Sequence, residues 1–353
     1  MNTPAEKRTL SFEALGERGV IDLIRRRFPS PASILPVGIG DDAAVAVSER
    51  GALEVLTTDS LVEGVHFDLR FSSFRDIGYK ALAVNVSDIA AMGGTPRLAL
   101  LSFILPAGGS REFEVRDLDE LLDGFAEIAA ETRVILAGGN ISRTAGPGPA
   151  PFVVDVSVLG WVRPRKVLTR GGGRAGDALY VTGTIGTAAA GLGWLRAHAA
   201  NSSTLPDDAG LAECVARYRR PAPRARIGAV MGRTRAASAA MDLSDGLADA
   251  VTQVAEASGT GAVIDAGSLP VHPAAAQWFD AQGREPIQAA VAGGDDYELI
   301  FAVPRRAKGR LRNAVHHARG VPLTRIGELT TDRAIVLRRE GVTQPLPRGF
   351  THF

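Results

Sequence analysis

The sequence of 353 residues is poor in several residue types, and each absence narrows the range of functions. A single cysteine, Cys214, excludes an internal disulfide and any zinc site built on cysteines. Lysine occurs only at Lys7, Lys80, Lys166 and Lys308. None of these lysines lies in a Gly-x-x-x-x-Gly-Lys-[Ser/Thr] loop, which excludes a P-loop nucleotide site. A Gly-x-Gly-x-x-Gly motif between a strand and a helix is also missing, so a dinucleotide site of the Rossmann type is unsupported.

Long apolar runs and strong charge are absent as well. No run reaches membrane-spanning length, and the N-terminal stretch lacks the apolar core of a signal peptide. The formal net charge of +1 gives no argument for a nucleic-acid partner or an anionic membrane. We therefore expect a cytoplasmic protein that acts on neither nucleic acid nor membranes.

The composition that is present indicates an ordinary globular protein. A hydrophobic content of 45% with 40 glycines is typical of an α/β fold, and the length suffices for two domains with full cores. Residues 163–176 are basic and glycine-rich, and we place the domain boundary at their start. The sequence therefore predicts an N-terminal α/β domain over residues 1–162 and a C-terminal α/β domain over residues 163–353.

The stretch 55–67, VLTTDSLVEGVHF, organises the chain. It opens as an apolar strand and turns polar at Thr57, Thr58 and Asp59. Side chains alternate between the faces of a strand, so Thr57 and Asp59 share one face unless the strand ends there. Hydroxyls beside an aspartate suit a hard cation. The alternative is a strand end with a turn-forming aspartate and a histidine, His66, at the edge of the core.

A recurrent unit then follows along the chain, in which a glycine-permitted turn at a strand end carries polar side chains. Its members are Asp41/Asp42, Thr57/Asp59, Asn140 in Gly138-Gly139-Asn140, Asp242/Ser244/Asp245 and Asp295/Asp296. Each unit alone can be a solvated turn, and Ser244 or Asp245 can simply cap the helix that we expect to begin at Leu247. We expect an apolar strand to follow Asp42 and a turn over residues 138–143.

Asp88 adds a carboxylate from a nearly charge-free helix expected over residues 75–93. A buried carboxylate must be paired, protonated or bound to a metal. The alternative for Asp88 is an ion pair with an arginine. Two further features have alternatives. Arg170 before three glycines is either an anion contact or part of a flexible basic linker. The strand–turn–helix over residues 178–198 either holds phosphate at its helix N-terminus or is a plain βα turn.

Together these carboxylates indicate cations. Like charges about 4 Å apart cost on the order of 4 kcal/mol at an effective dielectric of 20, so convergent carboxylates need cations between them. Oxygen ligands without cysteine favour magnesium over zinc or copper. Several magnesium ions in one cleft usually carry phosphate groups.

Eight segments in order carry a resemblance to a known family. They are GIGDDAAV, TTDSLVEGVHF, YKALAVNVSDIAAMGG, GGN-ISR, KVLTRGGGRAGD, YVTGTIGTAAAGL, MDLSDGL and GGDDYELIF, with a closing GF-THF. Their order and spacing resemble those of thiamine-monophosphate kinase, a family of the aminoimidazole ribonucleotide synthetase-like superfamily. The resemblance spans roughly residues 38–301.

The resemblance implies ATP-dependent phosphorylation of thiamine monophosphate to thiamine diphosphate by direct transfer of the γ-phosphate. It implies several magnesium ions, ATP as co-substrate, and a homodimer formed through the N-terminal sheet, with the active site in the cleft between the two domains. The implied magnesium ligands are Asp42, Thr57, Thr58, Asp59, Asp88, Asp242 and Asp245. The implied ATP contacts are Gly139, Asn140, Arg170 and Ser244, and the implied substrate contacts are His66, Asp295 and Phe350.

One position departs from the family pattern. Family members read Gly-Gly-Asp where this chain reads Gly138-Gly139-Asn140. Asparagine keeps a carbonyl oxygen and loses the charge of the aspartate that binds magnesium. Two alternatives therefore stay open: a relative that activates another phosphate, acid or amide substrate with ATP, and a weakly active nucleotide-binding protein.

Overall fold

The computed structural model describes residues 12–29, 31–106, 113–145, 150–199, 205–318, 320–347 and 349. The helices are α1 (Phe12–Arg27), α2 (Phe74–Ala91), α3 (Val115–Thr132), α4 (Thr187–Ala197), α5 (Ala209–Arg219), α6 (Ala225–Thr234), α7 (Leu247–Ser258), α8 (Pro273–Ala281), α9 (Pro286–Ala292) and α10 (Lys308–Ala318). The strands are β1 (Leu53–Val62), β2 (Thr95–Leu105), β3 (Ile135–Arg143), β4 (Val153–Val162), β5 (Ala178–Thr182), β6 (Ala239–Asp242), β7 (Gly261–Asp265), β8 (Leu299–Val303), β9 (Leu323–Thr330), β10 (Ile335–Arg339) and β11 (Val342–Pro345).

The chain forms two compact units. The first comprises residues 1–48, 58–82 and 98–157, and the second comprises residues 49–57, 83–97 and 158–353. The α/β class and the two sheets expected from the sequence are confirmed. The boundary at residue 163 stays a prediction.

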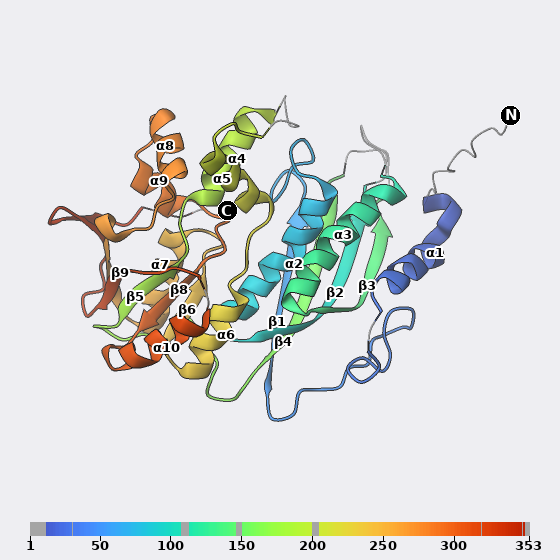
Figure 1. Ribbon diagram of the computed structural model, residues 1–353, viewed down its shortest axis with the longest axis horizontal. Helices are drawn as coiled ribbons and strands as arrows, with labels where there is room; N and C mark the ends of the chain where they lie inside the picture. Colours follow the sequence, from blue (N-terminus) through green and yellow to red (C-terminus); the bar gives the residue numbers. More distant parts are fainter. Residues whose placement is uncertain are drawn as a thin grey trace. The chain divides into compact units, whose positions relative to one another are not determined.

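The first unit is built on a four-stranded sheet with the order β1-β4-β2-β3, in which β2 and β3 run parallel. Helix α3 and the first part of α2 lie over one face of it (Figure 1). The two helices touch through glycines, because a Cβ at Gly78 would collide with Leu121 O and one at Gly124 with Arg75 O. Strand β4 alternates strictly between buried and half-buried residues, as expected of a sheet with one covered face.

The second unit is built on a seven-stranded sheet with the order β11-β10-β7-β9-β5-β8-β6. Strand β8 is buried along its whole length, so helices must cover both faces of the sheet. Ile300 and Ala302 belong to a hydrophobic cluster with α7, whereas Leu299, Phe301 and Val303 belong to another with α6 and α10. Figure 1 labels α7, α6 and α10 around these strands.

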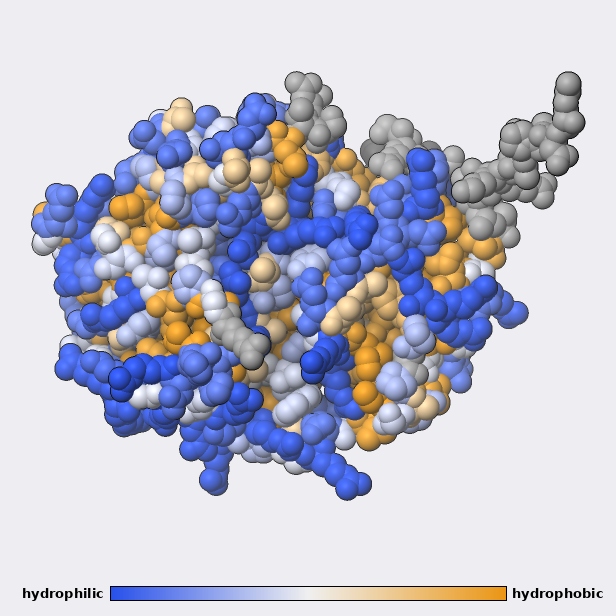
Figure 2. Space-filling model, viewed as in Figure 1, coloured by the Kyte–Doolittle hydropathy of each residue, from blue (hydrophilic) through white to orange (hydrophobic). Residues whose placement is uncertain are grey.

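The sequence patterns missed α8, α9 and α10. Helices α8 and α9 are short, and each has a proline in its first turn, Pro273 and Pro286. Proline is tolerated there because the first N–H groups of a helix have no intrahelical partner. Within the described residues no helix is long and apolar enough to cross a membrane. Figure 2 shows hydrophilic side chains over most of the face in view.

Candidate active site

Two of the predicted segments, 242–246 and 293–298, lie side by side in the second unit. The N–H of Asp295 donates to Ser244 O at 2.7 Å, and the N–H of Tyr297 donates to Leu243 O at 3.1 Å. The approach is so close that Gly246, with φ +95°, has no room for a Cβ beside Gly293 O. The structure therefore brings together Asp242, Ser244, Asp245 and Asp295, which the sequence places about fifty residues apart.

The alternative that Ser244 or Asp245 caps α7 is wrong. The N-cap residue is Gly246, which has no side chain to make a capping hydrogen bond. Gly246 takes this position because only glycine adopts its positive φ without strain and without the clash described above. The polar side chains of this segment therefore need a role other than capping.

Two carboxylates, one buried and one half-buried, link α2 to its neighbours within the second unit. Asp242, which is 4% exposed, accepts a hydrogen bond from the Ser87 hydroxyl at 2.8 Å. Asp88, the next residue on the helix, accepts one from the Thr57 hydroxyl at 2.5 Å. Hydroxyl groups thus satisfy the predicted magnesium ligands Asp242 and Asp88, and the predicted ligand Thr57 lies beside Asp88. The alternative of an ion pair between Asp88 and an arginine stays open.

Strand β1 continues through the polar residues instead of ending at Leu56. Its alternation places Thr57 and Asp59 on one face and Thr58 on the other. The Thr58 hydroxyl lies 2.9 Å from the Ser157 hydroxyl of β4. The structure therefore separates the side chain of Thr58 from the face that carries Thr57 and Asp59.

His66 lies in a tight loop after β1. Its Nδ1 accepts a hydrogen bond from the N–H of Val62 at 3.1 Å, so the imidazole is neutral at this nitrogen. Its carbonyl oxygen accepts one from the ammonium of Lys80 at 3.1 Å, and Lys80 is 3% exposed. Gly64, with φ +83°, permits the turn. The loop therefore fixes the orientation of the predicted substrate contact His66.

The segment around Asp42 differs from the prediction. The strand expected after Asp42 is absent from the described residues. The segment forms only isolated bridges, between Val37 and Val45 and between Ile39 and Asp41. Nearly all residues from 40 to 50 are exposed, including Asp41 and Asp42. The apolar residues Val45 and Val47 are 53% and 48% exposed, so burial does not hold them in a sheet.

The turn expected over residues 138–143 is also wrong, because these residues continue β3. Leu100 of β2 pairs with Gly138 whereas Ala99 pairs with Leu136, so Ala137 forms a β-bulge. Gly139 is required because a Cβ there would collide with Leu101 O. The glycines thus serve a bulge and a close approach of strands. Asn140 is exposed, and its amide donates to the Ser142 hydroxyl at 3.0 Å.

Arg170 lies at the start of the glycine-rich segment in the second unit. Its guanidinium donates to the side-chain oxygen of Gln253 on α7, and its carbonyl oxygen accepts from the Ser258 hydroxyl at 3.1 Å. The same hydroxyl accepts from the N–H of Gly173 at 3.0 Å. These contacts hold the segment against α7, so the alternative of a flexible linker is wrong.

Sequence reasoning missed the roles of two carboxylates beside Asp295. Asp296, which is 1% exposed, accepts hydrogen bonds from the N–H of Gly186 at 2.7 Å and of Ala188 at 3.0 Å. It therefore occupies the N-terminus of α4, which the sequence analysis considered as a phosphate site. Burial raises the pKa of Asp296 to about 7, although the two backbone hydrogen bonds oppose this shift.

Glu298 is the second missed carboxylate and is also 1% exposed. It accepts hydrogen bonds from the Thr182 hydroxyl at 2.5 Å and from Arg224 Nε at 2.6 Å. Its carboxylate fills the space where a Cβ at Gly183 would lie. The sequence offered one signal for these roles. Asp296 and Glu298 are two residues apart and directly precede a fully apolar strand, so their side chains lie on the same, inward face.

The backbone of the segment that carries Asp295, Asp296 and Glu298 is strained. Asp295 has φ 67° and Tyr297 has φ 49°, in the left-handed region that side chains other than glycine rarely adopt. Such residues persist only where the surroundings hold them, and they concentrate at functional sites. The strain therefore marks Asp295 as held in place by its neighbours.

Cys214 does not fit the role of a nucleophile. It is fully buried, and burial raises the pKa of its thiol to about 12. Its Sγ lies 3.6 Å from His272 Nδ1. At neutral pH the thiol is protonated and enclosed, so it cannot attack a substrate.

Phe350 lies outside the described residues. Gly349 is described, and a Cβ built on it would lie 3.1 Å from Asp245 O and 3.1 Å from the Asp249 side chain. Within the part of the chain that the structure describes, no three His, Cys, Asp or Glu side chains form a group that could hold a metal ion. Of the predicted carboxylate ligands, Asp88 and Asp242 each accept a hydrogen bond from a hydroxyl group.

Comparisons with known proteins define the class of this chain. Residues 40–162 match the N-terminal domain of AIR synthase related proteins, and residues 174–340 match the C-terminal domain. The chain belongs to the AIR synthase related protein family.

Several proteins that this chain resembles are named thiamine-monophosphate kinase. The thiamine-monophosphate kinase of Bacillus subtilis (strain 168) is 35% identical over 91% of this chain and 94% of its own length. The crystal structure of thiamine-monophosphate kinase from Stenotrophomonas maltophilia K279a is 33% identical, covers 92% of this chain and 96% of that chain, and has a TM-score of 0.79. The structure of AaThiL complexed with AMPPCP and TMP is 30% identical, covers 98% of this chain and 100% of that chain, and has a TM-score of 0.72.

Proposed function

We propose that this protein is a thiamine-monophosphate kinase, which transfers the γ-phosphate of ATP to thiamine monophosphate and yields thiamine diphosphate and ADP. The observation that carries the proposal is the identity of 35% with a named kinase over nearly the whole chain. The relative complexed with AMPPCP and TMP supports ATP as co-substrate, because AMPPCP is an analogue of ATP. The comparisons do not favour another acid or amide substrate.

Magnesium is part of this proposal. The predicted ligands offer only carboxylate and hydroxyl oxygens, which are the ligands that magnesium prefers. The carboxylates of Asp242 and Asp88 lie beside the hydroxyl groups of Ser87 and Thr57, and Thr57 is itself a proposed ligand. In phosphoryl transfer, magnesium neutralises the charge that develops on the transferred group. We assign Asp42, Thr57, Asp59, Asp88, Asp242 and Asp245 to this role through their side chains.

The other polar residues would position the substrates. Asp295 and Ser244 are held by the hydrogen bond between their segments, and His66 by its own loop. Arg170 presents a guanidinium, which suits phosphate oxygens. Gly139 and Asn140 remain proposed ATP contacts, and Phe350 a proposed substrate contact. Direct transfer fits the inert Cys214, since no protein nucleophile is then required.

The defining experiment is an assay for thiamine diphosphate with ATP, magnesium and thiamine monophosphate. We expect one ADP per thiamine diphosphate and no product in excess EDTA. Product formation undiminished by EDTA would refute the magnesium assignment, and no product at all would refute the kinase.

Two variants test the metal ligands within that assay. Asp88→Asn and Asp59→Asn should each abolish turnover while the protein stays folded, because each removes a charge that a cation compensates. Asp76→Asn is the matched control, since Asp76 lies on the same helix α2 and pairs with Ser73 instead. Near-normal turnover in either of the first two variants would show that its assignment is wrong.

A homodimer formed through the four-stranded sheet is also proposed. On the face of β2 opposite its buried residues, Leu100 is 39% exposed and Ile104 is 40% exposed. Apolar side chains on the open face of a sheet are typical of an interface, and a second copy would cover them. The variant Ile104→Arg should yield monomers in light scattering, whereas Val342→Arg, at a residue that is 71% exposed on β11, should not. A dimeric Ile104→Arg protein would contradict this interface.

A further inference from the structure

A hollow lies in the second unit, and it is lined by residues other than those assigned above. It has a volume of about 660 Å³. It is lined by Gly172, Arg174, Ala175, Gly176, Asp177, Ser238, Pro304, Arg305 and Arg306. None of these residues belongs to the proposed metal, ATP or substrate contacts.

The strands place this hollow at the opposite end of the sheet from Asp242. Ser238 immediately precedes β6 and Asp242 ends it, while β8 runs antiparallel from Leu299 to Val303, just before Pro304. At about 3.3 Å per residue, four residues of strand separate the two ends by roughly 13 Å. The hollow is therefore a separate place on the same strands, not an extension of the candidate active site.

The charge of the hollow is positive. Three arginines, Arg174, Arg305 and Arg306, line the hollow together with a single carboxylate residue, Asp177. Within the described residues none of the three arginines takes part in an ion pair. Three cationic side chains on one concave surface without internal carboxylate partners indicate an anionic ligand from outside.

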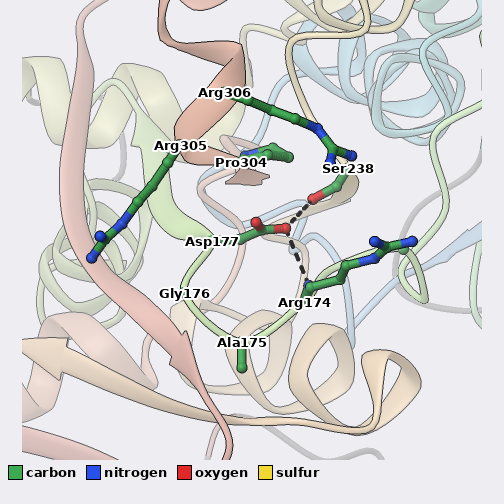
Figure 3. A pocket seen from close by; sticks show the side chains of 9 residues that line it. Arg174, Ala175, Gly176, Asp177, Ser238, Pro304, Arg305 and Arg306 are labelled. Carbon is green, nitrogen blue, oxygen red and sulfur yellow. Dashed lines mark hydrogen bonds between the residues drawn. The ribbon is translucent and has the colours of Figure 1, made fainter.

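The single carboxylate is already engaged in the structure. Asp177 is 6% exposed and accepts hydrogen bonds from the Ser238 hydroxyl at 2.6 Å and from the N–H of Arg174 at 3.1 Å. Figure 3 shows both bonds as dashed lines at the centre of the hollow. Asp177 therefore holds the wall together and leaves the guanidinium groups available.

The arginines differ in direction. Figure 3 shows that the side chains of Arg174 and Arg306 extend to the side of the hollow where Ser238 lies, whereas Arg305 extends the other way. Two planar guanidinium forks on one side suit the several oxygens of a phosphate group. Arg174 and Arg306 are therefore the two residues expected to bind the anion, and Arg305 serves as the control position.

The walls are suited to a small molecule. Gly172 has no room for a Cβ beside Ser238 O, and the N–H of Gly173 is fixed by the Ser258 hydroxyl at 3.0 Å, so this wall is rigid backbone. A volume of about 660 Å³ exceeds the need of a lone phosphate ion and falls in the range of roughly 300–1,000 Å³ that is typical of small-molecule sites.

We propose that this hollow binds the diphosphate group of a small anionic molecule through Arg174 and Arg306. Binding here requires no magnesium, since the one carboxylate of the hollow is engaged by the protein. The inference stands apart from the kinase proposal, because it concerns other residues and is tested without turnover.

The test is calorimetric titration of the full-length protein with inorganic pyrophosphate in excess EDTA and at low salt. EDTA removes the metal-dependent phosphate binding proposed for the active site. We expect wild type to bind pyrophosphate and the variant R174Q/R306Q to bind it at least about tenfold more weakly, since both charge-assisted contacts are lost. The variant R305Q should differ from wild type by less than about threefold.

Controls keep the outcome decisive. Thermal unfolding must give the same midpoint for both variants and wild type; if R174Q/R306Q is unstable, the variant R306Q alone and the salt dependence of wild type replace it. Binding should weaken as salt rises, because exposed charges are screened. The proposal is overturned by equal affinity in wild type and in the folded Arg306 variant, or by no binding to wild type.

A second arm identifies the source of the diphosphate group. ADP replaces pyrophosphate under the same conditions. Tighter binding of ADP that is lost in R174Q/R306Q assigns the hollow to an organic diphosphate, and equal binding of both probes assigns it to the diphosphate group alone. Tight binding of ADP that survives in R174Q/R306Q, with no pyrophosphate binding, overturns the proposal.

Discussion

The sequence Gly-Asp-Asp occurs twice at a predicted strand end, and the two copies have opposite environments. In Gly40-Asp41-Asp42 both carboxylates are exposed. In Gly294-Asp295-Asp296 the last carboxylate is 1% exposed and holds the N-terminus of α4. The same three letters thus serve an open acidic segment in one place and an internal support in the other. Burial, rather than the motif, decides which carboxylates are available for ligands.

The largest effect on turnover is expected for a substitution in the exposed copy, Gly40-Asp41-Asp42. Asp42→Asn should reduce turnover by about a hundredfold or more, because a proposed magnesium ligand loses its charge. The free energy of unfolding should change by less than about 0.5 kcal/mol, since the side chain is exposed. Kinetics and urea denaturation measure the two quantities. Asp41→Asn is the matched control, and a large stability loss in Asp42→Asn would remove the contrast between the copies.

The second prediction concerns Glu298, which follows the buried copy and pairs with Arg224. In Arg224→Met, the carboxylate of Glu298 keeps the hydrogen bond from the Thr182 hydroxyl but loses its closest cation. The remaining cation is Arg217, whose Nη1 lies 4.0 Å from Glu298 Oε1. Leaving a buried charge uncompensated costs about 3–5 kcal/mol, and the remaining partners place the expected loss near the lower value. Denaturation in urea measures it.

The control for this variant is Arg325→Met. Arg325 pairs with Glu328 at 3.1 Å, and both side chains are substantially exposed. Exposed pairs contribute little, so the midpoint should not move measurably. Equal stability of Arg224→Met and wild type would show that Glu298 is not held by this pair.

The third prediction uses the pKa of Asp296, which burial raises from 3.8 to about 7. Below about pH 4 the carboxyl is protonated in both the folded and the unfolded chain. As the pH rises, the unfolded chain loses this proton first, so the free energy of unfolding falls until the folded carboxyl also ionises near pH 7. This group alone lowers stability by up to about 4 kcal/mol across that window.

Asp296→Asn should remove this component of the pH dependence, while Asp41→Asn should leave it in place. Urea denaturation at several values between pH 4 and pH 8 gives the difference between variant and wild type. Parallel pH profiles for Asp296→Asn and wild type would contradict the raised pKa.

The smallest expected effect concerns Asn140, the proposed ATP contact that carries an amide in place of the carboxylate expected from the resemblance. A carboxylate attracts magnesium more strongly than an amide does. Asn140→Asp should therefore lower the magnesium concentration for half-maximal rate several-fold, and Ser142→Ala, which removes the hydroxyl beside Asn140, should not. A magnesium titration at saturating ATP checks this. An unchanged or raised requirement would refute the placement of residue 140 beside a metal.

The sequence predicted the elements that have strong periodicity and failed where tertiary contacts decide. The helix carrying Asp88 and the strand at 178–182 were located within a few residues. The glycines at 138 and 139 were interpreted as a turn because β2, the adjacent strand that requires Gly139, is roughly forty residues away in the sequence. Local patterns cannot reveal such a partner.

The candidate site shows the same division. Residue types and motif order identified the acidic segments, and the structure confirms that 242–246 and 293–298 lie together. The roles of Asp296 and Glu298 were missed because they depend on Gly186 and Arg224, which are distant in the sequence. Charge alone cannot distinguish a carboxylate that binds a ligand from one that supports the fold.

The β-bulge at Ala137 has a consequence for evolution. Side chains alternate along a strand, and the bulge absorbs one extra residue, so Asn140 stays paired with Ser102. A regular ladder that kept Ala137 would pair Asn140 with Phe103, whose side chain is 1% exposed, and would turn Asn140 to the buried face. A lineage that replaced the bulge with a regular ladder and lost no codon would therefore keep every functional residue in its gene and lose the proposed ATP contact from its exposed face.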